Sequence, residues 1–231
     1  MFDETLQNLL TEAFAASGCP VCTVVGAMVF RELCKLQRDA VVDPDTHADV
    51  LARGGYCADH FWYLDALASP VTNAALLAPL LELVSERLTA ASNRIAADSA
   101  LLRQGAAVIG EDLGLPGACR VCERVVLWER AVLAAVLEVA TQPQRRQEYT
   151  SSNGLCLPHL ARALSVAPNP SIAEMLVRTG AEQAQRLAAD LRTYVRKHEQ
   201  RDRRWGREEA APRAAIEKLA GGKRRAGGTE S

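Results

Sequence analysis

Apolar residues recur at intervals of three and four along most of the chain, a spacing typical of amphipathic α-helices. Residues 3–17 carry four apolar side chains at this spacing, and a glycine follows as a natural stop. Further helices are expected over about residues 22–42, within the stretch "GGYCADHFWYLDALA" and over about residues 71–104. No segment alternates with the period of two that strands require. The sequence therefore predicts an all-α protein.

The long helix over about residues 71–104 carries the clearest apolar stripe of the first half. Its members follow one another at alternating steps of four and three, which places them on one helix face. We expect that face to pack inside a helical bundle. The stripe consists of Leu77, Leu81, Val84, Leu88, Ala91, Ile95 and Leu102.

The pattern of elements repeats in the second half of the chain. Residues 105–118 hold four glycines and one proline, which favours a linker. Beyond them a helix, a turn with a short helix, and a long helix follow in the same order. We therefore expect a two-fold internally duplicated helical bundle. Its modules are predicted to span residues 1–104 and 119–204, followed by a basic tail over 205–231 with one short helix and a disordered end.

Cysteine and histidine repeat in register with the helices. Each half holds one C-x2-C pair and, further on, one C-x2-H pair; Cys119 follows Cys19 by 100 residues, and His159 follows His60 by 99. Of the seven cysteines only Cys34 falls outside, and because Ala134 stands at the matching position we expect Cys34 to be a small buried apolar residue. The expected ligand sets are Cys19, Cys22, Cys57 and His60 in the first half, and Cys119, Cys122, Cys156 and His159 in the second.

Three thiolates and one imidazole form a closed tetrahedral set that is typical of structural zinc. Glycine-assisted turns and helix starts bring ligands three apart together, and a helix N-terminus favours thiolate over thiol. The sequence thus predicts one zinc ion in each half, two per chain, in a protein that acts as a scaffold or adaptor. The alternative is an iron–sulfur or thiol-based redox or sensor protein using the same residues. A metalloenzyme is the least favoured interpretation, because catalytic zinc keeps an open position.

Charge and hydropathy limit the partners and the cellular location that we expect. The net charge is −1, although the stretch from Arg192 to Arg225 holds 12 Lys and Arg against 5 Asp and Glu. These charges are mixed in sign, so nucleic acid is a disfavoured partner. A protein partner is compatible with the sequence, and so are a monomer and a homodimer.

The start of the chain is acidic where a signal peptide is basic, and the longest apolar run is too short to span a bilayer. We expect a cytoplasmic protein, whose reduced thiols disfavour disulfides.

Five stretches together resemble an uncharacterised bacterial family of unknown function: "CPVC", "GGYCADHFWYL", "CRVCE", "GLCLPHLARAL" and the tail "WGREEAAPRAAIEKLAGG". That family pairs CPxC…GFCxxH with CxxCE…GFCxPH modules and ends in a WG…RAIEKL segment. Tyr56 and Leu155 stand here where phenylalanine is common. The resemblance implies two Cys/His modules and brings no activity with it. It also implies that the tail docks on the body, through Trp205 and Ile216.

Overall fold

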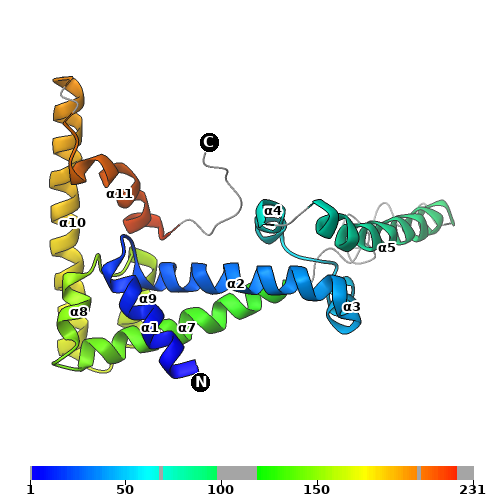
Figure 1. The fold of residues 1–231 in the computed structure, drawn as a ribbon, viewed down its shortest axis with the longest axis horizontal. Coiled ribbons are helices and arrows are strands. Elements are labelled where there is room, and N and C mark those ends of the chain that lie inside the picture. Colours follow the sequence, from blue (N-terminus) through cyan, green and yellow to red (C-terminus); the bar gives the residue numbers. More distant parts are fainter. Residues whose placement is uncertain (1, 68–69, 98–118, 202–203, 223–231) are drawn as a thin grey trace. The chain divides into compact units, whose positions relative to one another are not determined.

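The structure is a computed structural model that describes residues 2–67, 70–97, 119–201 and 204–222 (Figure 1). These residues form ten α-helices, one 3₁₀ helix and no strand, so the all-α prediction is confirmed for them. The expected linker at 105–118 lies outside the described residues. The helices are α1 (Phe2–Ala15), α2 (Pro20–Val42), α3 (Pro44–Ala52), α4 (Ala58–Leu67), α5 (Pro70–Ala97), α7 (Arg120–Thr141), α8 (Arg146–Ser151), α9 (Leu157–Ser165), α10 (Pro170–Glu199), the 3₁₀ helix η2 (Arg207–Ala210) and α11 (Ala211–Ala220).

Local chemistry explains where several helices begin. Asp43 caps α3, since its carboxylate accepts hydrogen bonds from the backbone amides of Asp45 and Thr46. Asn169 caps α10 in the same way, accepting from the amide of Ile172 at 3.0 Å. Proline follows each cap at the first helical position, where its missing N–H costs nothing. The starts of α3 and α10 are therefore determined by the local sequence.

The chain forms two compact units, and each draws on both halves of the sequence. Of the described residues, unit 1 holds 2–28, 126–201 and 204–222, and unit 2 holds 29–67, 70–97 and 119–125. Helices α2 and α7 each contribute residues to both units. The described helices have similar lengths in the two halves, with 23, 9, 10 and 28 residues from α2 to α5 and 22, 6, 9 and 30 from α7 to α10. An internal duplication and its module boundaries stay predictions.

The core of unit 1 is formed by α1, α8, α9 and α10 together with the parts of α2 and α7 that belong to this unit. Helix α1 packs on α8, and Phe14 meets Tyr149 edge to face with ring centroids 6.3 Å apart. Helices α9 and α11 both contact α10. The fully buried side chains include Leu10, Val21, Val136, Tyr149, Leu155 and Leu176.

In unit 2, α3 and α4 pack against α5. Tyr56 is buried and meets Phe61 edge to face at 5.6 Å. The predicted packing of the α5 stripe is wrong at Leu81, Val84 and Leu88, which are exposed. The buried residues of α5 are Leu76 and Leu80, which lie outside the stripe, and Ala91, which belongs to it.

Two smaller expectations are also corrected. Cys34 is half-buried rather than buried. In the tail, Trp205 does dock, stacking on Tyr194 of α10 at 5.2 Å, but Ile216 is 66% exposed and does not. Helix α11 instead contacts α9 and α10 along other residues (Figure 1).

Among the described helices, none combines the length and apolar character needed to cross a membrane.

Candidate metal centres

All four ligand pairs occupy the same kind of place, the start of a helix. Cys19, Cys57, Cys119 and Cys156 each stand just before a helix, and their carbonyls accept the first helical hydrogen bond, from the amide four residues on. The second ligand of each pair lies in the first helical turn. Side chains at the cap and three residues later face one another, as they do in a capping box. A three-residue spacing at a helix start therefore brings two ligands together by local geometry alone.

The structure combines these pairs differently from the sequence prediction. Cys19 and Cys22 meet Cys156 and His159 in unit 1, whereas Cys119 and Cys122 meet Cys57 and His60 in unit 2. The expected grouping, with one complete site in each half, is therefore wrong, although all eight residues take part. We call the first cluster site A and the second site B.

The length of α2 gives a physical reason for this exchange. The helix carries Cys19 and Cys22 at its start and continues for 23 residues, about 35 Å. The chain from its far end to Cys57 includes the nine-residue helix α3 and spans only about 34 Å if fully straight. It would have to run directly back along α2 to reach the first pair. The C-x2-H pair of the other half completes the site instead.

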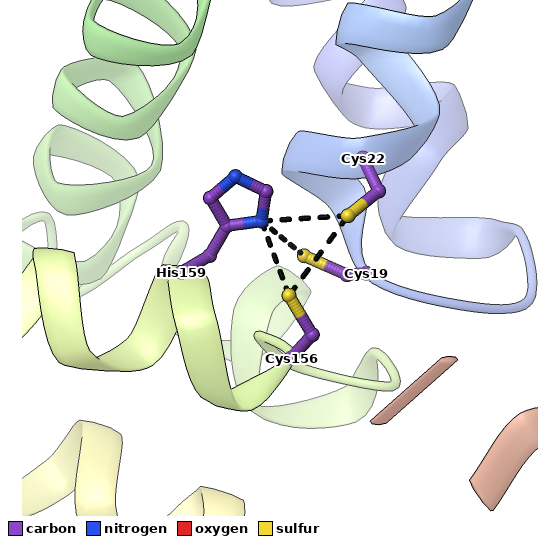
Figure 2. Close-up of side chains that lie close together, drawn as sticks. All are labelled: Cys19, Cys22, Cys156 and His159. Carbon is purple, nitrogen blue, oxygen red and sulfur yellow. Dashed lines mark hydrogen bonds between the residues drawn. The ribbon is translucent and has the colours of Figure 1, made fainter. Parts of the chain in front are cut away.

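Site A gathers its four side chains from the starts of α2 and α9 (Figure 2). The Nδ1 atom of His159 lies 3.5 Å from the sulfur of Cys19, 3.4 Å from that of Cys22 and 3.1 Å from that of Cys156. The sulfurs of Cys22 and Cys156 are 3.9 Å apart. Cys19, Cys156 and His159 are buried, and Cys22 is half-buried. The cluster is thus closed on most sides by protein.

Site B has nearly the same internal geometry. The Nδ1 atom of His60 lies 3.1 Å from the sulfur of Cys57 and 3.5 Å from those of Cys119 and Cys122. The sulfurs of Cys57 and Cys122 are 3.6 Å apart. Here only Cys119 is buried, and the other three ligands are half-buried. The two sites differ in surroundings and agree in shape.

These separations match the edges of a tetrahedron around one ion. For zinc with sulfur at about 2.3 Å and nitrogen at about 2.0 Å, two sulfurs lie about 3.8 Å apart and sulfur and nitrogen about 3.5 Å apart. In each cluster all four ligand atoms lie within 4.8 Å of one another. The sulfur–sulfur distances far exceed the roughly 2.05 Å of a disulfide, and all seven cysteines are free. Both clusters can therefore hold a single four-coordinate ion.

The electrostatics of site A favour a cation. Hydrogen bonds from Cys156 and Cys22 hold the pKa of Cys19 far below its ordinary value. The pKa of Cys22 is raised, because its thiol donates to the sulfurs of Cys156 and Cys19. Burial opposes protonation of His159, but its hydrogen bonds to Cys156 and Cys19 outweigh burial and raise its pKa to about 10. The cluster thus favours a thiolate at Cys19, at the N-terminus of α2.

Site B is polarised in the same sense. Burial would raise the pKa of Cys119, but hydrogen bonds from His60 and from backbone amides outweigh it and lower the pKa to about 6. The pKa of Cys122 rises to about 12, first because of burial and then because of its hydrogen bond to Cys57. Thiolate forms readily at one corner of this site as well. A metal ion bound there would replace the shared proton.

One carboxylate stands behind the histidine of site A. The Nε2 atom of His159 lies 3.6 Å from Glu129 on α7, an electrostatic contact slightly longer than a direct hydrogen bond. The Glu129 side chain is mostly buried and pairs with Arg162 of α9. A carboxylate in this place orients a metal-bound imidazole and raises its basicity. At the corresponding position of the first half, 100 residues earlier, stands Val29, which offers no such group.

Site B is flanked by an ionic cluster. Asp49 of α3 accepts hydrogen bonds from Arg53 at 2.9 Å and from Arg120 at 2.7 Å, and Arg53 also reaches Glu123 at 3.0 Å. Arg120 and Glu123 belong to the first turn of α7, next to the ligands Cys119 and Cys122. These partly exposed ion pairs tie α3 to the helix start that carries half of the site.

Comparison with known proteins gives the chain a family. Its sequence matches a family of unknown function, DUF6062, over residues 3–226. The chain belongs to that family. The match covers nearly the whole chain, including both clusters and the described tail, and confirms the resemblance drawn from the motifs. No curated protein and no solved structure matches the chain. Membership in DUF6062 therefore brings no activity, and the chemistry rests on the clusters themselves.

The ligands were visible in the sequence, but their surroundings were not. Glu129 lies within "LWER", seven residues after Cys122, with nothing to mark it. Its role depends on the packing of α7 against α9, which the sequence does not display. Asp49 carries no sequence signal for its contact with site B, because the packing of α3 against the start of α7 brings it to Arg120. A sequence signal was available for Gly154, since a glycine two residues before a ligand cysteine indicates a tight turn. In the structure it has φ +61°, and an added Cβ would overlap the side-chain oxygen of Gln183.

Proposed function

We propose that the protein is a zinc-binding helical scaffold in which site A and site B each hold one Zn²⁺ as a structural ion. The observation that carries this is the geometry of the ligand atoms, whose separations fit the edges of a zinc tetrahedron twice in one chain. Each site offers four protein ligands, which leaves no open position of the kind that catalytic zinc uses. A protein partner that binds the scaffold belongs to the same proposal.

The ions would supply stability where helix packing alone is sparse. Each site joins two segments more than 50 residues apart in the sequence, such as α2 with α9 in unit 1. Binding a metal to preformed ligands contributes its free energy directly to the folded state. Two such links would fix helix starts whose short flanking helices, α3, α4, α8 and α9, have ten residues or fewer.

The single-ion geometry favours zinc over a polynuclear iron–sulfur cluster. In such a cluster the four protein ligands are divided over two or four iron atoms, which spreads the ligand set as a whole further apart than one ion does. Sulfur–sulfur distances of 3.6 and 3.9 Å suit a shared ion. A thiol-based sensor is the second candidate, and the half-buried Cys57 and Cys122 of site B favour it, because exposed thiolates react with oxidants.

Anaerobic purification of the full chain, with its visible spectrum and metal content, tests the proposal. We expect a colourless protein with about two zinc ions per chain. A brown protein with absorption in the visible range would replace zinc with an iron–sulfur cluster. A folded, metal-free protein would overturn metal binding altogether. Loss of one zinc ion on mild peroxide treatment, with oxidation confined to site B, would support the sensor instead.

A further inference from the structure

The end of the described chain folds back onto site A. Trp205 stacks on Tyr194, and Glu208 binds Lys197 of α10, which anchors the start of the tail. Helix α11 then runs along α9 and α10 and ends at Ala220, with Gly221 as its C-cap residue. We call Lys218, Gly221 and Gly222 together the C-terminal cap. It lies within unit 1, as site A does.

Lys218 holds the loop that carries one of the ligands. Its ammonium donates to the carbonyl of Leu155 at 2.7 Å, to the side-chain oxygen of Gln183 at 3.0 Å and to the carbonyl of Asn153 at 3.4 Å. Asn153 and Leu155 lie three residues and one residue before Cys156, the most buried ligand of the site. Three donors of one cation therefore meet three acceptors, two of them in the turn that presents Cys156.

Gly222 reaches the other side of the same cluster. Its backbone amide donates a hydrogen bond to the sulfur of Cys22, with nitrogen and sulfur 3.2 Å apart. An added Cβ at Gly222 would lie 2.9 Å from the Cβ of Cys22, so a larger residue would push the chain away. At Gly221, with φ +87°, an added Cβ would lie 3.6 Å from the sulfur of Cys156. Two successive glycines thus let the backbone approach the sulfurs closely.

We propose that the C-terminal cap retains the metal ion of site A, acting as a lid whose Gly222 amide binds the Cys22 thiolate while Lys218 fixes the Cys156 loop. The inference rests on metal binding at site A, as proposed above. A hydrogen bond to a thiolate withdraws charge from the sulfur and makes it a poorer target for protons and competing metals or chelators. Cys22 is the least buried sulfur of the site, so it is where a chelator would begin. Opening the cap therefore controls how fast the ion leaves.

The rate of zinc transfer to the chromogenic chelator 4-(2-pyridylazo)resorcinol, measured anaerobically on the full zinc-loaded chain, tests the cap. Cys57→Ser, which keeps all four ligands only at site A, identifies the release phase of that site. Gly222→Pro removes the amide donor, and Lys218→Met removes the ammonium while keeping the length of the side chain. Leu219→Ala is the matched control, because its side chain is 64% exposed on the same helix.

We expect Gly222→Pro and Lys218→Met to speed zinc release from site A by about 10-fold and to leave the release from site B unchanged. This is the scale of the effect of removing a group that hydrogen-bonds a metal ligand. With cobalt in place of zinc, Gly222→Pro should shift the sulfur-to-metal charge-transfer band, and Leu219→Ala should not. Gly222→Ala keeps the amide but adds a Cβ that crowds Cys22, so this variant should also release zinc from site A faster. It keeps the test valid if the proline variant misfolds. Parent-like release rates in all three variants would overturn the cap and leave zinc binding intact. A parent chain without bound metal would overturn both.

Discussion

Site A and site B have the same ligands, the same helix-start geometry and nearly the same internal distances, yet they are held in different ways. Site A is mostly buried, backed by Glu129 and covered by the C-terminal cap. Three of the four ligands of site B are half-buried, and partly exposed ion pairs flank it. The comparison shows that ligand geometry comes from short local segments, whereas retention of an ion depends on what packs around them.

Burial and ionic contacts respond differently to conditions. Water and chelators reach a half-buried thiolate more easily than a covered one, so site B should exchange its ion faster. Salt screens the ion pairs around Asp49, while contacts at buried groups such as Cys156 and His159 are screened much less. The two sites should therefore separate in kinetics, in stability and in their dependence on salt.

The largest difference is expected on removing one ligand from each site. Cys156→Ser should lower the free energy of unfolding by more than about 4 kcal/mol, because a buried metal link is lost and polar groups stay behind. Cys57→Ser should cost about 2 kcal/mol, since solvent reaches the half-buried site B. Urea unfolding followed by two probes measures both losses of free energy. Analysis of the metal content should find one ion in each variant. Cys34→Ser, outside both sites, should keep two. Equal losses at the two sites would break the comparison.

A smaller effect is expected at the carboxylate behind His159. Glu129→Gln should weaken zinc binding at site A by about 10-fold or more, the range known for partners that orient a metal-bound histidine, and should leave site B unchanged. Chelator competition measures the affinity of each site.

Arg162→Met provides the control for that experiment, because it breaks the ion pair with Glu129 but leaves the carboxylate beside His159. It should weaken site A much less than Glu129→Gln. If the two variants weaken site A equally, Glu129 matters for packing α9 onto α7 and not for the histidine.

The smallest effect is expected at the ionic cluster beside site B. Asp49→Asn should lower the stability of the folded chain by about 1 kcal/mol at low salt and by less in 1 M NaCl, because the pairs are partly exposed and screened. Asp39→Asn, which loses only its pair with the neighbouring Arg38, should change nothing measurable. A loss at Asp49 that is independent of salt would contradict an electrostatic role.

The pH dependence of this cluster has a definite sign. Hydrogen bonds from Arg53 and then Arg120 hold the pKa of Asp49 below its ordinary value of 3.8. A depressed pKa means that the carboxylate stabilises the folded state above that ordinary value, and the contribution is lost as the pH falls below it. The difference between the parent and Asp49→Asn should therefore be full at neutral pH and vanish in strong acid.

Much of the fold could be predicted because helix signals are local. The apolar spacing, the glycine stops and the proline starts place most helices correctly, for example α2 ending at Val42 and α10 beginning at Pro170. The prediction failed where burial depends on neighbours: Leu81, Val84 and Leu88 are exposed although they form a regular stripe. A stripe shows that a face is apolar, but only tertiary packing decides whether another element covers it.

The sequence by itself determined the eight ligands, their Cys3His chemistry and their location at four helix starts, because a three-residue spacing at a helix N-terminus is fixed by local geometry. Only the tertiary structure decided which pairs share an ion. Both C-x2-H pairs are chemically equivalent partners for either C-x2-C pair, so the choice depends on helix length and packing, and α2 is too long for Cys57 to return easily to Cys19. The same packing brings Glu129 behind His159 and Gly222 onto Cys22, contacts between residues 30 and 200 positions apart.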